Sequence, residues 1–142
     1  MKLRDGKYAL MAITSMGVRI TPVNRRPVHT CDTFTMTATS AESNVLNISA
    51  SLGLPVKVLT KFVEDSVVAE FIKRKLRERG IEYEGVNVPQ GGAWGYRHQF
   101  NIADSGFGPR GPRVQNDRAG EVGRTLKAED FDLKRLFEDE GC

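Results

Sequence analysis

The sequence has few of the residues from which metal sites and disulfide scaffolds are built. Its 142 residues include two cysteines, Cys31 and Cys142, and two histidines, His29 and His98. Neither cysteine belongs to a C-x-x-C pair, and the two histidines supply too few further ligands for a structural zinc site. No apolar run approaches the roughly 20 residues that a membrane-spanning helix needs. We therefore expect no structural metal, no disulfide framework and no membrane segment.

The N-terminal segment lacks the pattern of a secretory signal. Lys2 and Arg4 would suit its positively charged start, but Asp5 and Lys7 interrupt the region where the apolar stretch would have to lie. We therefore expect a soluble protein of the cytoplasm. With 142 residues, 39% of them hydrophobic, the chain is long enough for one domain with its own core.

A strong excess of charge is also missing, since the formal net charge is +3. Basic residues gather at positions 73–79, and Phe71, Ile72 and Leu76 are interleaved with them at helical spacing. This pattern is typical of the solvated face of an amphipathic helix. Nucleic-acid binding is the alternative, but no aromatic or glycine platform accompanies the basic residues. We expect no nucleic-acid partner.

Several nucleotide-binding and hydrolase motifs are absent or out of context. Residues 106–111 spell G-x-G-x-x-G, but Pro109 and Pro112 stand where a phosphate-binding helix would have to begin and continue. The segment is therefore interpreted as a hairpin loop. The sequence contains no G-x-x-x-x-G-K-[ST], G-x-S-x-G or H-E-x-x-H string.

Hydrophobic periodicity predicts a mixed α/β chain. Alternation and short apolar runs indicate strands at 8–14, 18–20, 31–39, 56–59, 94–102 and 112–119. Helical spacing indicates helices at 44–52, 66–79 and 129–138. The first of these places Val45, Ile48 and Leu52 on one apolar stripe, and residues 81–92 are interpreted as a polar connection. The helix–strand–helix order over 40–80 favours a parallel sheet.

These elements predict two parts within one domain over residues 1–142. An α/β body comprises about 40–80 and 130–142, and a mostly antiparallel sheet comprises about 8–37 and 94–119. The strand at 94–102 would place five side chains on one face: Trp94, Tyr96, His98, Phe100 and Ile102. A ligand is expected between the two parts.

The most informative stretch is residues 39–45, where a strand passes into a helix. Small residues there would let a ligand approach the backbone, and the helix N-terminus adds free N–H donors. Ordinary helix capping is the alternative. Six further segments carry a resemblance to a known family: Thr21-Pro22, Leu52-Gly53, Val56–Thr60 with Glu64-Asp65, 76–81, 116–120 and 130–132.

In order and spacing, these segments resemble the ribokinase-like PfkB carbohydrate kinases, of the 2-keto-3-deoxygluconate kinase type. The resemblance covers essentially the whole chain. It implies a ribokinase-like fold: a partial parallel sheet with flanking helices, plus a β lid that closes over the sugar. Thr39-Ser40 stands where the family has a glycine pair, and Asn116 where this branch often has Tyr. These departures leave the identity of the sugar open.

The resemblance implies a set of substrate-binding residues. Asn44 would hydrogen-bond sugar hydroxyls above a floor formed by the Ser40 and Ala41 backbone, with a further contact from the Ser40 hydroxyl. Arg118 would bind the carboxylate of a sugar acid, because its guanidinium fork matches that geometry. Asn116 and Arg97 would add sugar contacts. The alternatives are a surface salt bridge from Arg118 to Asp117 or Glu121, and a solvated cation on a polar strand face for Arg97.

The resemblance also implies what the rest of such an enzyme supplies. The family's general-base Asp, its anion-binding glycines and its nucleotide pocket lie in a later part, which this sequence does not contain. The whole enzyme would use ATP and Mg²⁺ to phosphorylate a sugar acid, and this chain alone is expected to lack catalysis. The alternative is a stand-alone, non-catalytic module for sugar-acid binding or dimerisation. A homodimer through the lid sheet is expected, because an exposed apolar sheet face favours a partner.

Overall fold

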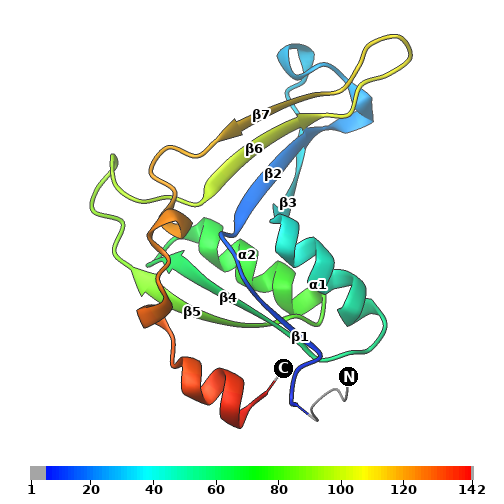
Figure 1. The fold of residues 1–142 in the computed structure, drawn as a ribbon. Helices are drawn as coiled ribbons and strands as arrows, with labels where there is room; N and C mark the ends of the chain where they lie inside the picture. Colours follow the sequence, from blue (N-terminus) through cyan, green and yellow to red (C-terminus); the bar gives the residue numbers. More distant parts are fainter. Residues whose placement is uncertain (1–5, 142) are drawn as a thin grey trace.

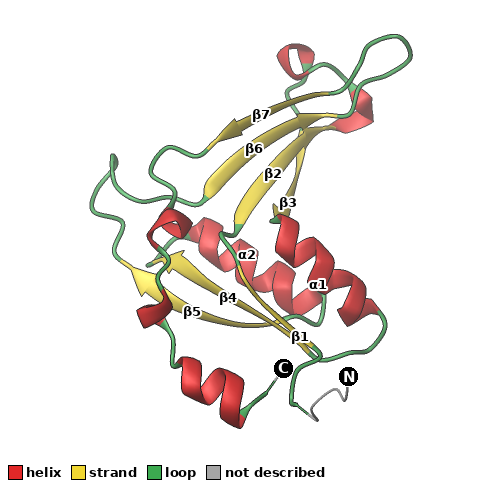
Figure 2. Ribbon diagram, viewed as in Figure 1, coloured by secondary structure: helices red, strands yellow, loops and turns green. Residues whose placement is uncertain are grey.

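Two sheets joined by four chain crossings form the framework (Figure 1). The computed structural model describes residues 6–141; Lys2, Arg4, Asp5 and Cys142 lie outside the described residues. The first sheet is parallel, with strand order β1-β4-β5: β1 (Leu10–Ile13), β4 (Val56–Val63) and β5 (Glu82–Val88). Helices α1 (Ala41–Ser51) and α2 (Val67–Glu78) cover one of its faces (Figure 2).

The second sheet is mostly antiparallel and has the order β3-β2-β6-β7. Its strands are β2 (Gly17–Pro22), β3 (Phe34–Thr39), β6 (Gln99–Asp104) and β7 (Arg113–Asp117). The pairs β2–β3 and β6–β7 are antiparallel, whereas β2 and β6 run in parallel. The remaining elements are 3₁₀ turns at Val23–Arg25, Val28–Thr30, Val122–Thr125 and Ala128–Asp130, and a π-helical turn at Arg135–Asp139.

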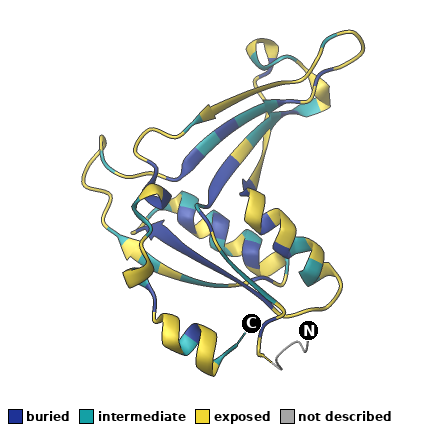
Figure 3. Cartoon of the chain, viewed as in Figure 1, coloured by how far each residue is buried: buried dark blue, intermediate teal, exposed yellow. Residues whose placement is uncertain are grey.

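Strand β4 is the centre of the core, and all eight of its residues are buried (Figure 3). Successive side chains of a strand point to opposite faces. Val58 and Phe62 therefore meet the helices, in a cluster with Leu46, Ile72 and other residues. Leu59 points to the other face and packs with Phe131 and Leu136 of the C-terminal segment.

The helices begin and end where local chemistry directs. Ser40 caps α1 and Ser66 caps α2, each accepting a backbone N–H three residues later. Gly80 follows α2 with φ of +68°, the left-handed conformation that glycine adopts without steric cost. The helix expected at 66–79 is therefore found within one residue at each end.

Residues 10–13 were assigned to the wrong sheet by the sequence analysis. The apolar run at 8–14 forms β1, which pairs with β4 in parallel, Leu10 beside Val56. A continuous apolar run suits a parallel strand packed on both faces, so it belongs to the body and not to the four-stranded sheet. The four-stranded sheet begins only at Gly17.

Three further expectations were wrong. Residues 82–88 are strand β5 and not a connection; β5 is an edge strand, so its side chains alternate between exposed and half-buried instead of forming an apolar run. On α1 the expected stripe of Val45, Ile48 and Leu52 is exposed, and Ser43 and Leu46 form the buried face. The first helix also begins three residues earlier than expected, because Ser40 is its cap.

The expected strand at 94–102 begins at Gln99. Residues before it form a loop in which Gly91 and Gly92 have positive φ, and Trp94 at its tip is fully exposed. The expected row of five side chains therefore does not form: His98 is buried, while Trp94 and Tyr96 project from the loop. The turn expected at residues 103–112 is found at 105–112, as the hairpin loop between β6 and β7.

An ion network attaches the C-terminal segment to the helix-free face of the parallel sheet. Lys57 Nζ, buried on β4, lies 2.8 Å from Glu140 Oε2 and 3.2 Å from Glu84 Oε2. Arg135 bonds to both of these carboxylates. A hydrogen bond from Lys57 holds the pKa of Glu140 below its ordinary value. Burial would raise the pKa of Glu84, but hydrogen bonds from Arg135 and Lys57 outweigh burial and lower it.

Acid should therefore release this segment. A carboxyl group whose pKa is lowered by folding contributes stability above its unfolded pKa of about 4.3, and this contribution is lost as pH falls through the folded pKa. We predict that the melting temperature of the E140Q variant is below that of wild type at pH 7 and approaches it as the pH falls below about 4. Thermal melts followed by circular dichroism from pH 7 to 3 test this. E138Q, which changes an exposed acid in the same turn, should follow wild type; an E140Q profile parallel to wild type would contradict the prediction.

Candidate functional site

The two sheets meet at the carboxyl ends of the parallel strands, the edge at which open α/β sheets bind ligands. Thr14 follows β1 at this edge, and its Oγ1 donates to Glu42 Oε2 in the first turn of α1 at 2.6 Å. Strand β3 passes directly into α1 through Thr39 and Ser40. The N-terminus of α1 and the base of the four-stranded sheet are therefore adjacent (Figure 1).

A row of polar side chains crosses one face of the four-stranded sheet. Arg19 on β2 is in register with Asn101 on β6, which is in register with Asn116 on β7. Arg19 Nε donates to Asn101 Oδ1 at 3.2 Å, and Asn101 Nδ2 donates to Asn116 Oδ1. We call Arg19, Asn101 and Asn116 the polar row. Of its three members only Asn116 was predicted to be functional, because pairing between strands 82 residues apart is not visible in the sequence.

The opposite face of the same sheet is apolar. Near the parallel sheet, Val18, Ala38 and Phe100 pack into the core with α2. Farther along β3, Phe34 and Met36 are exposed. The sheet thus presents different chemistry on its two faces.

Of the three predicted residues at the start of α1, Ser40 is buried and hydrogen-bonded within the helix cap, whereas Ala41 and Asn44 are exposed. Ser40 is buried; its Oγ accepts from Ser43 N at 2.9 Å, and its N–H donates to Ser43 Oγ at 3.1 Å. The Ser40 hydroxyl therefore has the capping role named as the alternative, and its contact with a sugar stays a prediction. Ala41 and Asn44 are exposed on the first turn.

Arg97 is bound within the protein. Its Nη2 lies 2.9 and 3.0 Å from the two carboxylate oxygens of Asp117, and its Nε donates to Ala119 O at 2.6 Å. Its backbone also bonds to Gly120 and Val122. Arg97 thus ties the loop before β6 to the segment after β7, a role that differs both from the expected sugar contact and from the alternative of a solvated cation on a strand face.

Arg118 follows β7, and 61% of its side chain is exposed. Its Nη1 lies 3.7 Å from Glu121 Oε2, so the salt bridge considered as the alternative is present, at a distance beyond hydrogen bonding. Within residues 6–141, no hydrogen bond or ion pair joins Asn116 or Arg118 to Ser40, Ala41 or Asn44. The predicted residues therefore form two groups, one on α1 and one on the four-stranded sheet.

His98 connects the two sheets at the base of β6. Val63 N, at the end of β4, donates to His98 Nε2 at 3.3 Å, so the ring proton lies on Nδ1 and is donated to Met16 O at 3.0 Å. Burial lowers the pKa of His98, and nearby Lys73 lowers it further, while the bond to Met16 and the charge of Glu121 act in the opposite direction. His98 is therefore a neutral structural residue of the junction.

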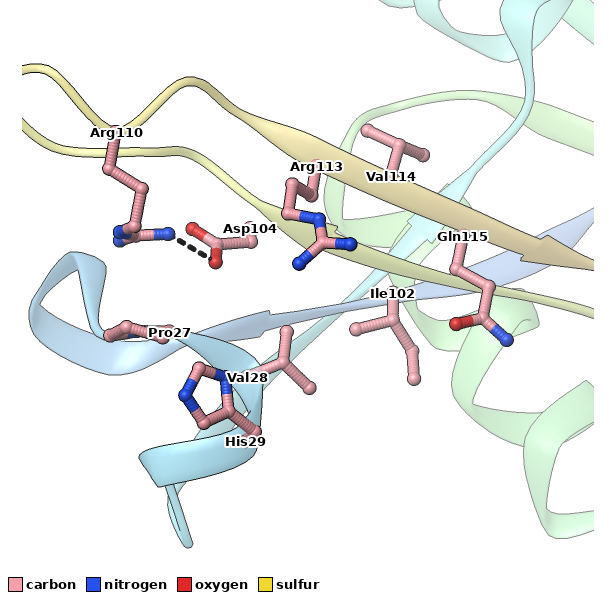
Figure 4. Close-up of a pocket in the computed structure, with 9 residues that line it drawn as sticks. All are labelled: Pro27, Val28, His29, Ile102, Asp104, Arg110, Arg113, Val114 and Gln115. Atoms are coloured by element: carbon pink, nitrogen blue, oxygen red, sulfur yellow. Dashed lines mark hydrogen bonds and ion pairs between the residues drawn. The ribbon is translucent and has the colours of Figure 1, made fainter.

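Two cavities lie beside the four-stranded sheet. One of about 530 Å³ lies between the start of α2 and the base of the sheet, where Val68, Phe100 and Asp117 are among its lining residues. Another of about 520 Å³ lies at the far end, where the Arg110–Asp104 ion pair, Arg113 and Ile102 surround it (Figure 4). The far cavity contains none of the predicted site residues.

Metal-binding clusters and membrane-spanning helices were sought among the described residues. Residues 6–141 hold no group of three or more His, Cys, Asp or Glu side chains arranged to bind a metal ion. No helix within the same residues is long and apolar enough to cross a membrane.

Comparisons with solved structures identify the fold. No protein-family model and no curated protein matches the sequence. The chain superposes on the 2-dehydro-3-deoxygluconokinase of Thermotoga maritima with a TM-score of 0.81 and 23% identity, over 93% of this chain and 38% of that one. A PfkB-family carbohydrate kinase from Listeria grayi superposes with a TM-score of 0.78 and 21% identity, over 91% of this chain and 38% of that one. An uncharacterised sugar kinase from Pyrococcus horikoshii in complex with ATP superposes with a TM-score of 0.73 and 13% identity, over 91% of this chain and 40% of that one.

These similarities establish the fold. Residues 6–141 have the mixed architecture of the ribokinase-like carbohydrate kinases, with a parallel sheet and a mostly antiparallel second sheet, as the sequence resemblance implied. The chain spans about two fifths of the length of the structures that it matches.

The junction predicts a specific pH response. Because the pKa of His98 is lowered in the folded state, the unfolded chain binds the proton more readily below about pH 6.5. Stability should therefore fall as the pH drops from about 6.5 towards 5. We expect H98Q to be less stable than wild type at pH 7.5 but to lose this pH dependence, in chemical denaturation at several pH values. NMR titration of the imidazole should place the His98 transition below the ordinary value; a transition at or above it would contradict the prediction.

Proposed function

We propose that this chain is the sugar-binding and lid portion of a PfkB-type carbohydrate kinase that acts on a sugar acid such as 2-keto-3-deoxygluconate. The observation that carries this proposal is the position of two groups of polar residues. The N-terminus of α1 and the four-stranded sheet with its polar row both adjoin the carboxyl ends of the parallel strands. The fold shared with sugar kinases supports it.

The proposed roles follow from the hydrogen-bonding groups that each residue has available for a ligand. Asn44 is exposed on the first turn of α1, so its amide can both donate to and accept from sugar hydroxyls. Ser40 holds that turn in place through its cap, and the Ala41 backbone forms the floor. From β7, at the edge of the four-stranded sheet opposite β3, Asn116 contributes an amide from the polar row.

Arg118 is the proposed carboxylate-binding residue. Its guanidinium is exposed and carries no hydrogen bond among the described residues, whereas that of Arg97 is already occupied. A guanidinium donates two parallel bonds to a carboxylate, which a neutral sugar lacks. This difference favours a sugar acid over a neutral sugar as the substrate.

The proposed reaction transfers the γ-phosphoryl group of ATP, with Mg²⁺, to a sugar hydroxyl. Catalysis of phosphoryl transfer is mostly positioning and charge stabilisation. The residues of this chain would bind and orient the sugar and exclude water from it. By the family resemblance, the general base and the nucleotide pocket belong to a part of the enzyme outside this sequence.

A stand-alone sugar-acid-binding module is the second candidate function. The polar row and the exposed Arg118 are formed by this chain alone, which favours binding without catalysis. The two functions differ in one assay: the module binds the sugar acid and never turns over ATP, whether or not other segments are supplied.

Binding of 2-keto-3-deoxygluconate tests the proposed substrate class. We predict saturable binding by calorimetry and an affinity loss of about 10- to 100-fold in R118M, because a charge-assisted hydrogen bond contributes roughly 1.5–3 kcal/mol. R26M, which removes another exposed arginine, should bind like wild type. A neutral sugar of the same length should show no dependence on Arg118. Equal binding of the acid by wild type and R118M would refute the assignment.

We also propose that the chain forms a homodimer through the apolar face of the four-stranded sheet. Phe34 and Met36 remain exposed on that face, and exposed apolar strand faces favour association. Trp94 and Tyr96, which lie outside the strands, are not needed for it.

Two neighbouring substitutions on β3 test the dimer. M36D places a charge on the apolar face and should weaken self-association at least about tenfold, because a buried unpaired charge is costly. T37D places the same charge on the opposite face and should leave association unchanged. Sedimentation velocity over a range of concentrations distinguishes them, and a wild-type chain that stays monomeric at high concentration would exclude the interface.

A further inference from the structure

Glu121 is a buried carboxylate that the sequence analysis did not assign to the site. It follows β7 and is 2% exposed. One carboxylate oxygen, Oε1, accepts a hydrogen bond from Ser15 Oγ. The other, Oε2, is one of two buried side-chain polar atoms in residues 6–141 that have no hydrogen-bond partner. An unsatisfied buried carboxylate oxygen is costly, so its retention calls for a partner that can approach it.

The carboxylate is held in place from two sides. Ser15 lies in the connection from β1 to β2, and Glu121 lies in the connection that returns from β7. A Cβ at Gly123 would lie 2.0 Å from Ser15 Oγ, so these two connections are in direct contact and Ser15 has no room to move towards Gly123. Gln99 Nε2 also donates to Ser15 O at 3.4 Å. Glu121 is therefore a fixed point, not a mobile surface acid.

The group that faces the free oxygen is the guanidinium of Arg118. Nη1 lies 3.7 Å from Oε2, which is within ion-pair range but beyond a hydrogen bond. The buried end of this pair is rigid and the exposed end is a long side chain with several rotamers. An arginine has five N–H donors in a planar fork, so one edge can bond to Glu121 while another bonds to a ligand carboxylate.

We propose that Glu121 is a positioning residue that orients Arg118 for the carboxylate of a sugar acid. This inference rests on the proposed substrate class. Glu121 does not contact the ligand; it restricts the guanidinium before binding, which reduces the entropy lost when the ligand is bound. Ligand binding draws Arg118 towards Glu121 and completes the missing hydrogen bond to Oε2.

The E121Q variant isolates this role. Glutamine has the same shape and still accepts from Ser15, but its amide NH₂ presents donors to Arg118 in place of an anionic oxygen. We expect E121Q to weaken binding of 2-keto-3-deoxygluconate about fivefold to tenfold and to leave binding of a neutral sugar unchanged. E129Q, an exposed acid in the C-terminal segment, is the control for charge alone, and E121D should recover part of the loss.

A double-mutant cycle separates positioning from a general structural effect. If Glu121 acts through Arg118, E121Q costs nothing further in the R118M background. A structural role would give the same loss in both backgrounds and a lower melting temperature. Additive losses, or wild-type affinity in E121Q, would overturn the proposal.

A ligand-free measurement keeps this test independent of the proposed function. The Arg118 side-chain Nε–H should have a higher ¹⁵N order parameter in wild type than in E121Q, because only the carboxylate restrains it. If wild type binds no sugar acid but the order parameters differ, the proposed function fails and the restraint stands. Equal order parameters would refute the restraint even if the sugar acid binds.

Discussion

The orientation of the four-stranded sheet depends on how closely the chain packs where it passes between the two sheets. Within residues 6–141 the chain crosses after β1, β3, β5 and β7. A Cβ at Gly17 would lie 1.9 Å from Gln99 Cγ. The first and third crossings can therefore approach each other this closely only because residue 17 has no side chain. Gly123 meets Ser15 in the same way, and His98 bonds to Met16 and Val63 on either side. This close packing leaves the sheet one position relative to the body.

The junction is also the place where polar groups are buried. His98 is neutral and uses both ring nitrogens, so its burial costs little. Glu121 uses one oxygen and has a cation at the rim for the other. Arg97 and Asp117, whose side chains are about half exposed, form a further pair whose bonds close the loop before β6. The hydrogen bonds of His98 and Glu121 therefore join one crossing to another. The bond that fixes Glu121 also fixes the position of the carboxylate that Arg118 faces.

Much of the fold follows from local sequence patterns, and the site does so only in part. Helix α2 could be predicted because Ile72 and Leu76 repeat at helical spacing and Gly80 ends it, whereas the buried face of α1 could not, since it packs through Ser43 and Leu46 while larger apolar residues stay exposed. Asn116 and Arg118 were predicted from the family resemblance. Arg19, Asn101 and Glu121 were missed because their partners lie 15 to 106 residues away. Strand pairing brings Arg19, Asn101 and Asn116 together, and contact between two of the crossings brings Glu121 to Ser15.

The division of the site between two elements constrains how specificity can arise. Ser40, Ala41 and Asn44 belong to a helix whose first turn is held by its own cap, so this group is rigid with respect to the body. Arg19, Asn101 and Asn116 are rigid with respect to the four-stranded sheet, because each bonds to its neighbour across the strands. In the proposed site, a ligand that contacts both groups must span the distance between two preformed surfaces, so this distance would select ligands by their length. Differences between sugar acids would then be recognised by Arg118, the exposed side chain that follows β7, and Glu121, which restrains it, would influence specificity without contacting the ligand.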